Sequence, residues 1–168
     1  MKICIASVSP YVKSGYGVGT RSMVELLTSM GHEVVIYSFY GQHGTVGAYI
    51  TKCGSEVLIF PAPDNAKDKL KDLPALKILW DYDFVLSFYD LFAFPTSQME
   101  RNLWASILMI DSAPIVSSNL PMLAETDYIL TCSNWASETL DEYGHVLEGQ
   151  RVLDFVLPML DDDWPVGS

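Results

Sequence analysis

The sequence contains little cysteine and little histidine. Its three cysteines, Cys4, Cys53 and Cys132, are odd in number and far apart, and they form no C-x-x-C pair. This excludes a disulfide framework, and neither the cysteines nor the three histidines have the spacing of metal ligands. A free cysteine in or beside a predicted strand behaves as a small apolar side chain. We therefore expect a reduced, cytoplasmic protein without a metal site.

Long apolar runs and positive charge are also scarce. The first apolar run ends before Pro10 and Lys13, which is too short for a signal-peptide core, and no stretch approaches the length of a membrane span. Ten Lys and Arg residues oppose 21 Asp and Glu residues, which gives a net charge of −11. Such a charge repels nucleic acid and anionic lipid headgroups on average. We expect no nucleic-acid partner, and any ligand site must be local.

What the chain does contain is an alternation of buried strands and helices. With 49% hydrophobic residues, its 168 residues are enough for one domain with a sizeable core. Continuous apolar runs predict seven strands, and apolar residues at helical spacing predict three helices. The expected strands are Lys2–Val8, Glu33–Phe39, Glu56–Phe60, Phe84–Phe88, Trp104–Ile110, Tyr128–Cys132 and Val152–Leu157, and the expected helices are 20–30, 66–80 and 133–143.

This order predicts an α/β, Rossmann-like fold. We expect a doubly wound, mainly parallel sheet of about seven strands with helices on both faces, whose ligands bind beyond the carboxyl ends of the strands. Between the second and third strands, FYGQHGTVGAYI at 39–50 contains three glycines and predicts a mobile loop leading into a short helix. Gly31 stands where a glycine ends the first helix.

A glycine-rich segment, SGYGVGTR at 14–21, lies between the first strand and the first helix. Its glycines allow close backbone approach and positive φ angles, so that amides near a helix N-terminus can point at an anion. Lys13, Gly15, Tyr16 and Gly17 are therefore candidate binding residues.

The same segment does not match a dinucleotide fingerprint. The spacing Gly15-x-Gly17-x-Gly19 differs from G-x-G-x-x-G, and the second strand ends at Ser38-Phe39 without the carboxylate that would hold a ribose. A nicotinamide enzyme is disfavoured, although a Rossmann-type nucleotide-cofactor enzyme stays open as an alternative.

Three segments carry a more specific combination. Residues 1–38 give a strand, a glycine loop, a helix and then Gly-His-Glu-Val opening the second strand; ILMIDSAPIV follows at 107–116, and TDYILTCSNWASETLDEYG at 126–144. Together they resemble the N-terminal domain of family 4 glycosyltransferases (glycosyl transferases group 1) of the GT-B fold. The resemblance implies a sugar transferase that takes its sugar from a nucleotide-sugar donor, with retention of configuration. No other cofactor is implied.

The resemblance also implies a division of labour. In that family two Rossmann-like domains face a cleft, and the N-terminal one mostly holds the acceptor while the C-terminal one binds the donor. Residues 1–158 look like the first domain, 159–168 look like an acidic linker or truncated tail, and a donor-binding domain is absent from this sequence. The partners expected are the nucleotide sugar, the acceptor, and a C-terminal domain or partner subunit. An exposed face between domains predicts self-association.

Site residues follow from the matching positions. Lys13, Gly15, Tyr16 and Gly17 would stabilise the departing phosphate, together with the helix N-terminus. Asp111 and Asp90, which end predicted strands, are the candidate catalytic carboxylates, and the alternative for each is a loop or capping role. Ser133 and Asn134 are candidate binding residues that can instead cap the following helix. Asp161-Asp162-Asp163 satisfies D-x-D formally, but we interpret it as part of the solvated tail.

A second class of function stays open. A domain of this fold can bind a glycan or a partner protein without turnover, and the sequence does not separate that module from the enzyme.

Overall fold

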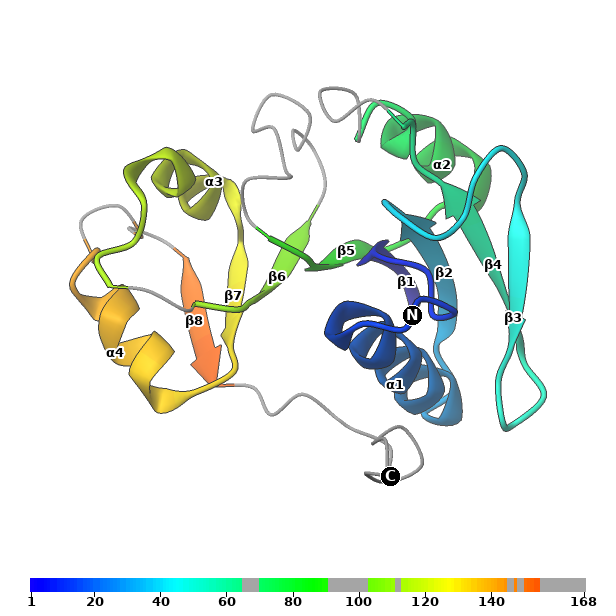
Figure 1. The fold of residues 1–168 in the computed structure, drawn as a ribbon, viewed down its shortest axis with the longest axis horizontal. Coiled ribbons are helices and arrows are strands. Elements are labelled where there is room, and N and C mark those ends of the chain that lie inside the picture. Colours follow the sequence, from blue (N-terminus) through cyan, green and yellow to red (C-terminus); the bar gives the residue numbers. More distant parts are fainter. Residues whose placement is uncertain (65–69, 91–102, 111–112, 145–146, 148–149, 155–168) are drawn as a thin grey trace.

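The computed structural model describes residues 1–64, 70–90, 103–110, 113–144, 147 and 150–154. Within this part of the chain the strands form an eight-stranded sheet in the order β3-β4-β2-β1-β5-β6-β7-β8 (Figure 1). Neighbouring strands run parallel except β3, which is antiparallel to β4. The strands are β1 (Lys2–Ser7), β2 (Glu33–Ser38), β3 (Gly47–Ile50), β4 (Glu56–Pro61), β5 (Phe84–Phe88), β6 (Trp104–Leu108), β7 (Tyr128–Thr131) and β8 (Arg151–Asp154).

Helices cover the sheet from both sides, as the sequence predicted. The helices are α1 (Gly15–Ser29), α2 (Leu73–Trp80), α3 (Leu120–Glu125) and α4 (Asn134–Asp141). Alternate residues of β1 point to opposite faces. Ile3 and Ile5 pack with Met23 of α1, whereas Cys4 packs with Leu73 of α2. Figure 1 shows α1 and α2 on opposite sides of β1 and β2. The fold is therefore Rossmann-like and doubly wound.

The first helix begins earlier than predicted. The glycine-rich segment is the first turn of α1, because Ser14 caps the helix by accepting a hydrogen bond from the Gly17 amide on its Oγ (3.2 Å). Neither Gly15 nor Gly17 has a positive φ angle, so the predicted loop with positive φ angles is wrong. At the other end Gly31 has a φ of +83°, which confirms it as the glycine that ends the helix.

The segment predicted as a loop leading into a short helix instead ends in strand β3. The buried carboxylate of Glu25 on α1 holds this strand in place. Its Oε1 accepts a hydrogen bond from the Tyr49 hydroxyl at 2.7 Å, and its Oε2 accepts one from the Lys52 amide at 2.9 Å. Buried charges are tolerated when they are fully hydrogen-bonded. These long-range contacts, rather than local sequence, make β3.

Several other element boundaries also differ from the prediction. α2 begins at Leu73, so that Pro74 lies in its first turn, where the missing N–H removes no helical hydrogen bond. α3 was not predicted, because its six residues are too few to show a helical period. The predicted last strand, Val152–Leu157, is observed as Arg151–Asp154, and its remaining residues lie outside the described part of the chain. The tail at 159–168 also lies outside it.

Candidate functional site

The candidate site is the rim at the carboxyl ends of four neighbouring strands, β4, β2, β1 and β5. We define the rim as segments 9–14, 39–46, 62–64 and 89–90 with the first turn of α1. Backbone hydrogen bonds join three of these segments to each other or to the strand ends. The Ser9 amide donates to the Tyr40 carbonyl (2.9 Å), and the Ala62 amide donates to the Ser38 carbonyl (2.8 Å). The rim is thus one connected layer.

Two glycines of the rim pack closely against Val12. A Cβ at Gly17 would lie 2.1 Å from the Val12 carbonyl oxygen, and a Cβ at Gly41 would lie 2.2 Å from Val12 Cγ2. Real Cβ atoms do not approach other atoms so closely, so both positions require glycine; Gly41 also has a φ of +84°. At Gly15, by contrast, a Cβ would meet nothing within 4 Å. Gly17 therefore allows segment 9–14 to pack against the first turn of α1, and Gly41 allows segment 39–46 to pack on the same segment.

The N-terminus of α1 opens onto the rim. All residues of this helix are described, and its first turn carries no acidic side chain. The partial positive charge of a helix N-terminus is therefore not neutralised from within the turn. Lys13, which is exposed, precedes the capping residue Ser14 and adds a full positive charge. This end of the helix is chemically suited to a phosphate or other anion.

The structure brings Tyr16 and Asp90 together. The Tyr16 hydroxyl donates a hydrogen bond to Asp90 Oδ1 at 2.6 Å, and both residues are half-buried. Beneath them Thr20 Oγ1 lies 2.8 Å from Ser7 Oγ, and the Ser7 hydroxyl donates to the Phe88 carbonyl at 2.6 Å. These buried hydroxyls connect α1 to the ends of β1 and β5. Asp90 is thus a carboxylate held at the rim, where it can accept a hydrogen bond from a ligand hydroxyl.

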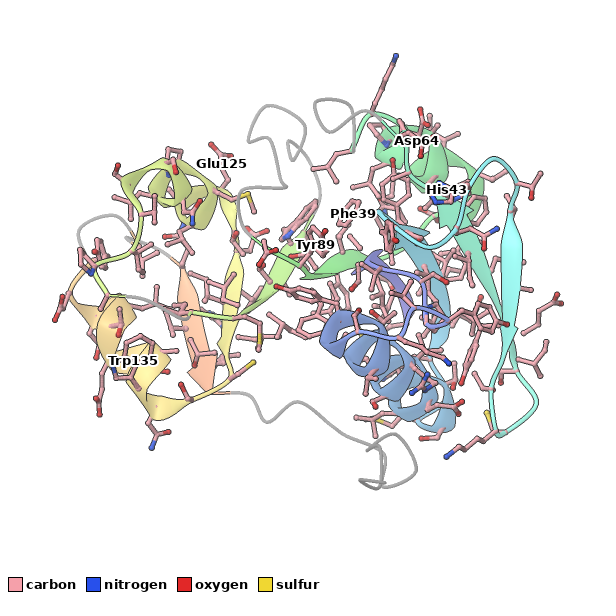
Figure 2. All side chains as sticks on the ribbon, viewed as in Figure 1. Phe39, His43, Asp64, Tyr89, Glu125 and Trp135 are labelled. Carbon is pink, nitrogen blue, oxygen red and sulfur yellow. The ribbon has the colours of Figure 1, made fainter. Side chains whose placement is uncertain are left out.

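Aromatic rings surround this carboxylate. The Tyr16 ring packs against Phe88 and Tyr89, with both centroid distances 5.0 Å, and Tyr89 packs against Phe39 at 5.5 Å. Figure 2 shows Phe39 and Tyr89 next to one another. Phe39 and Phe88 are buried, so they support the two half-buried rings, Tyr16 and Tyr89, from below. The apolar surface left beside Asp90 is that of Tyr16 and Tyr89, which suits a ligand that carries both C–H groups and hydroxyl groups.

One polar pair of the rim was not predicted. His43 Nδ1 and Asp64 Oδ1 lie 3.0 Å apart, and both side chains are exposed. The two residues are 21 positions apart in the sequence, with β4 between them. The order of the strands brings the two residues together, because their loops follow β2 and β4, which are neighbours in the sheet.

Of the other predicted site residues, Ser133 and Asn134 do not join this group. Ser133 caps α4 by accepting a hydrogen bond from the Ala136 amide on its Oγ (3.2 Å), and Asn134 is the first residue of that helix. Both lie beyond the end of β7, which β5 and β6 separate from β1. Asp111 lies outside the described residues. The capping interpretation of Ser133 is confirmed.

The amino end of the sheet carries the other notable features. A pocket of about 340 Å³ is lined there by His32, Glu33, Glu56 and Trp80, among others. Close to it is the turn between β3 and β4, which holds the exposed Cys53. Hydrogen bonds from Ser55 and Thr51 lower the pKa of the Cys53 thiol to about 7. This end of the molecule is remote from the rim, because the strands separate them.

The described part of the chain lacks two further features. No three His, Cys, Asp or Glu side chains gather there in a way that would hold a metal ion. Nor does any helix described there have the length and apolarity needed to cross a bilayer.

Comparisons with known proteins find a similar fold among solved structures. No protein-family model and no curated protein matches the sequence. Among solved structures, the fold is similar to that of a sucrose-phosphate synthase from Thermosynechococcus elongatus, with a TM-score of 0.62 and 12% identity. The match covers 97% of this chain and 91% of the other. The chain therefore shares the Rossmann-like fold of that structure. At this identity the likeness shows the fold and not the activity.

Proposed function

We propose that the chain is the acceptor-side domain of a glycosyltransferase that moves a sugar from a nucleotide-sugar donor to a hydroxyl acceptor, with retention of configuration. The observation that carries this proposal is the structural likeness to a sucrose-phosphate synthase along nearly the whole of both chains. The order of motifs in residues 1–38, 107–116 and 126–144 supports it independently. Residues 1–158 form the proposed domain.

The rim supplies groups suited to such a reaction. Sugar transfer builds negative charge on the departing phosphate, and the α1 N-terminus with Lys13 would stabilise that charge. The carboxylate of Asp90, oriented by the Tyr16 hydroxyl, would accept a hydrogen bond from a sugar hydroxyl. Asp111 is proposed as a second carboxylate from its position in the matching segment alone. No metal is required in this arrangement, because the helix and lysine carry the positive charge.

The rim argues against the nicotinamide alternative. β2 ends at Ser38, whose hydroxyl donates to the Tyr40 carbonyl at 2.8 Å. A dinucleotide site needs a carboxylate there to bind the ribose.

The test is transfer by the full product of the gene. UDP-, GDP- and ADP-sugars are offered with a panel of sugar and sugar-phosphate acceptors, and products are detected by mass spectrometry. We expect one donor to be consumed together with one acceptor. Glycan binding without any product would favour the non-catalytic module, and NAD or NADP binding would favour the Rossmann-type enzyme.

A matched pair of lysine variants tests the role of the rim. Lys13→Ala removes a charge beside the α1 N-terminus, and a charged contact of about 1.5–3 kcal/mol corresponds to roughly 10–100-fold in donor affinity. Lys52→Ala removes an exposed charge from the turn between β3 and β4. We expect the first variant to weaken donor binding, measured by calorimetry, and the second to leave it unchanged. Equal losses in both would mean that only the net charge of the protein matters.

A further inference from the structure

The cavity of about 340 Å³ at the amino end of the sheet has no part in the proposed function. It spans the starts of β2 and β4, from Thr28 of α1 on one face of the sheet to Trp80 of α2 on the other. Val34 and Val57 contribute apolar wall. Cavities that bind small molecules typically begin at about 300 Å³. This one is therefore large enough for a small ligand.

Two glutamates line the cavity from equivalent places on neighbouring strands. The register pairs Val35 of β2 with Leu58 of β4. Glu33 and Glu56, two residues earlier on each strand, therefore occupy matching positions on the same face. Among the described residues neither carboxylate has an ion-pair or hydrogen-bond partner. Like charges placed in this way repel each other. A cation bound by both carboxylates would relieve that repulsion.

The charge around these glutamates is negative. The last turn of α1 carries no basic side chain, so the partial negative charge of the helix C-terminus is not neutralised within the turn. Lys2 is the neighbour of Glu33 in the ladder. Its ammonium donates to the Trp80 carbonyl (3.4 Å) and lies 5.8 Å from the centre of the Trp80 ring. Lys2 balances only part of the charge of Glu33, Glu56 and Asp83, whose carboxylate accepts from the Lys2 amide.

An apolar surface lies beside the two glutamates on the same face. Leu58 follows Glu56 by two residues and is 36% exposed, although β4 lies inside the sheet between β3 and β2. Ile50 of β3, directly opposite Glu56 in the ladder, is 61% exposed. The half-buried ring of Trp80 lines the cavity next to them. An indole ring packs against apolar groups and attracts cations. This face therefore offers apolar contacts next to two carboxylates.

We propose that the cavity binds a small organic cation, a primary amine with an apolar body. The ammonium would donate hydrogen bonds to Glu33 and Glu56, and the apolar body would lie against Leu58 and Trp80. An ammonium has three donors and no acceptor, which matches carboxylates that only accept. The net charge of −11 attracts such a ligand and repels an anion. The proposal is independent of sugar transfer, because the strands separate this cavity from the rim.

The first experiment compares three probes of similar shape on the full chain. They are phenethylamine, the neutral phenethyl alcohol and the anionic phenylpropionate, and calorimetry at low salt measures their binding. We expect phenethylamine to bind, and the other two to bind at least about tenfold more weakly, because a charge-assisted hydrogen bond typically contributes that much. Equal affinity for the three probes would overturn the proposal. So would phenethylamine that does not bind at millimolar concentration.

NMR of protein labelled with ¹⁵N-tryptophan locates the bound probe. The ring N–H signal of Trp80, assigned with Trp80→Phe, should shift as phenethylamine is added. Trp135, which is exposed on α4, is the internal control and should keep its signal. A shift at Trp135 with none at Trp80 would place the amine elsewhere and overturn the proposal.

The second experiment removes charge without removing volume. The double variant Glu33→Gln with Glu56→Gln alters two exposed side chains, so the fold should persist, and thermal unfolding without the probe checks this. Glu138→Gln with Glu142→Gln is the matched control, because it changes the net charge equally at α4. We expect the first variant to lose at least about tenfold in phenethylamine affinity and the control to lose none. Equal losses in both, or no loss in either, would overturn the proposal.

Discussion

Carboxylates serve different partners at the two ends of the sheet. At the amino end, Asp83 Oδ2 accepts a hydrogen bond from the Lys2 amide and Asp127 Oδ2 accepts one from the Trp104 amide, both at 2.7 Å. At the carboxyl end, Asp90 instead accepts from the Tyr16 hydroxyl. Asp64 contacts an imidazole there. The first pair binds backbone, and the second binds side chains.

This difference in hydrogen-bond partners suggests that Asp83 and Asp127 at the amino end stabilise the fold, whereas the carboxylates at the carboxyl end are available for function. A backbone amide at the start of a strand cannot move without unfolding that strand, so its carboxylate has a permanent partner. A hydroxyl or an imidazole can rotate and exchange its partner for a ligand. We therefore expect changes at Asp83 and Asp127 to lower the free energy of unfolding, and changes at the rim to alter ligand chemistry. The following variants test that expectation.

The largest expected loss of stability is at the rim. It is an exception to the division between stabilising aspartates at the amino end and a functional carboxyl end. Gly17→Ala places a Cβ against the Val12 carbonyl, and overpacking of this kind costs about 1–3 kcal/mol. Gly15→Ala is the matched control, because its Cβ meets no atom within 4 Å. Urea unfolding of the two variants measures the difference. Equal stabilities would show that the first turn of α1 shifts freely away from Val12.

At the amino end we expect a smaller loss of stability. Asp127→Ala removes the acceptor of the partly buried Trp104 amide. An unsatisfied buried group costs about 1–3 kcal/mol. We expect a loss near the lower figure, because water can reach this amide. The free energy of unfolding should fall while donor affinity, measured by calorimetry, stays unchanged. A variant that binds donor more weakly at full stability would contradict the division between the two ends.

For Tyr16→Phe we expect the reverse of the Asp127→Ala result: a larger loss of turnover than of stability. The ring and its contacts with Phe88 and Tyr89 remain, and the hydrogen bond to Asp90 is lost. A hydrogen bond typically contributes about 0.5–1.5 kcal/mol, and the half-buried Asp90 can turn to water, so stability should fall by no more than about 1 kcal/mol. Turnover should fall further than stability. Thermal unfolding and an activity assay on one preparation compare the two, and a loss of stability alone would assign Tyr16 a purely structural role.

The smallest expected effect concerns the turn at the amino end. Because hydrogen bonds lower the pKa of Cys53 to about 7, much of this thiol is ionised at neutral pH, and it should react with iodoacetamide with a midpoint near pH 7. Burial raises the pKa of Cys4, which should stay unlabelled in the folded protein. In Ser55→Ala the midpoint should move upward, since the largest stabilising hydrogen bond is gone. Peptide mass spectrometry follows each site, and a midpoint unmoved by Ser55→Ala would mean that other groups hold the thiolate.

Much of the fold could be predicted because its strands are buried on both faces. β1, β2 and β5 are continuous apolar runs, and such runs show in sequence without knowledge of their neighbours. Gly31 and Ser133 were found because a helix end has a local chemical requirement.

The remaining features depend on contacts between distant residues. The start of α1 was placed too late, because glycine has low helix propensity and the packing on Val12 is invisible in the sequence. β3 exists through the buried carboxylate of Glu25. The pairing of His43 with Asp64 needs the order of the strands, which no spacing rule supplies. Asp90 and Tyr16 were each named from the sequence, but the hydrogen bond between them was not predicted.

The packing of Val12 between Gly17 and Gly41 also constrains how this protein can evolve. A smaller side chain at residue 12 would not make room at Gly17, because the nearest atom there is the backbone carbonyl oxygen of Val12. Nor would it release Gly41, whose φ of +84° is strained for any residue with a Cβ. An alignment of descendants of this chain would therefore show glycine kept at 17 and 41 while the side chain at residue 12 varies.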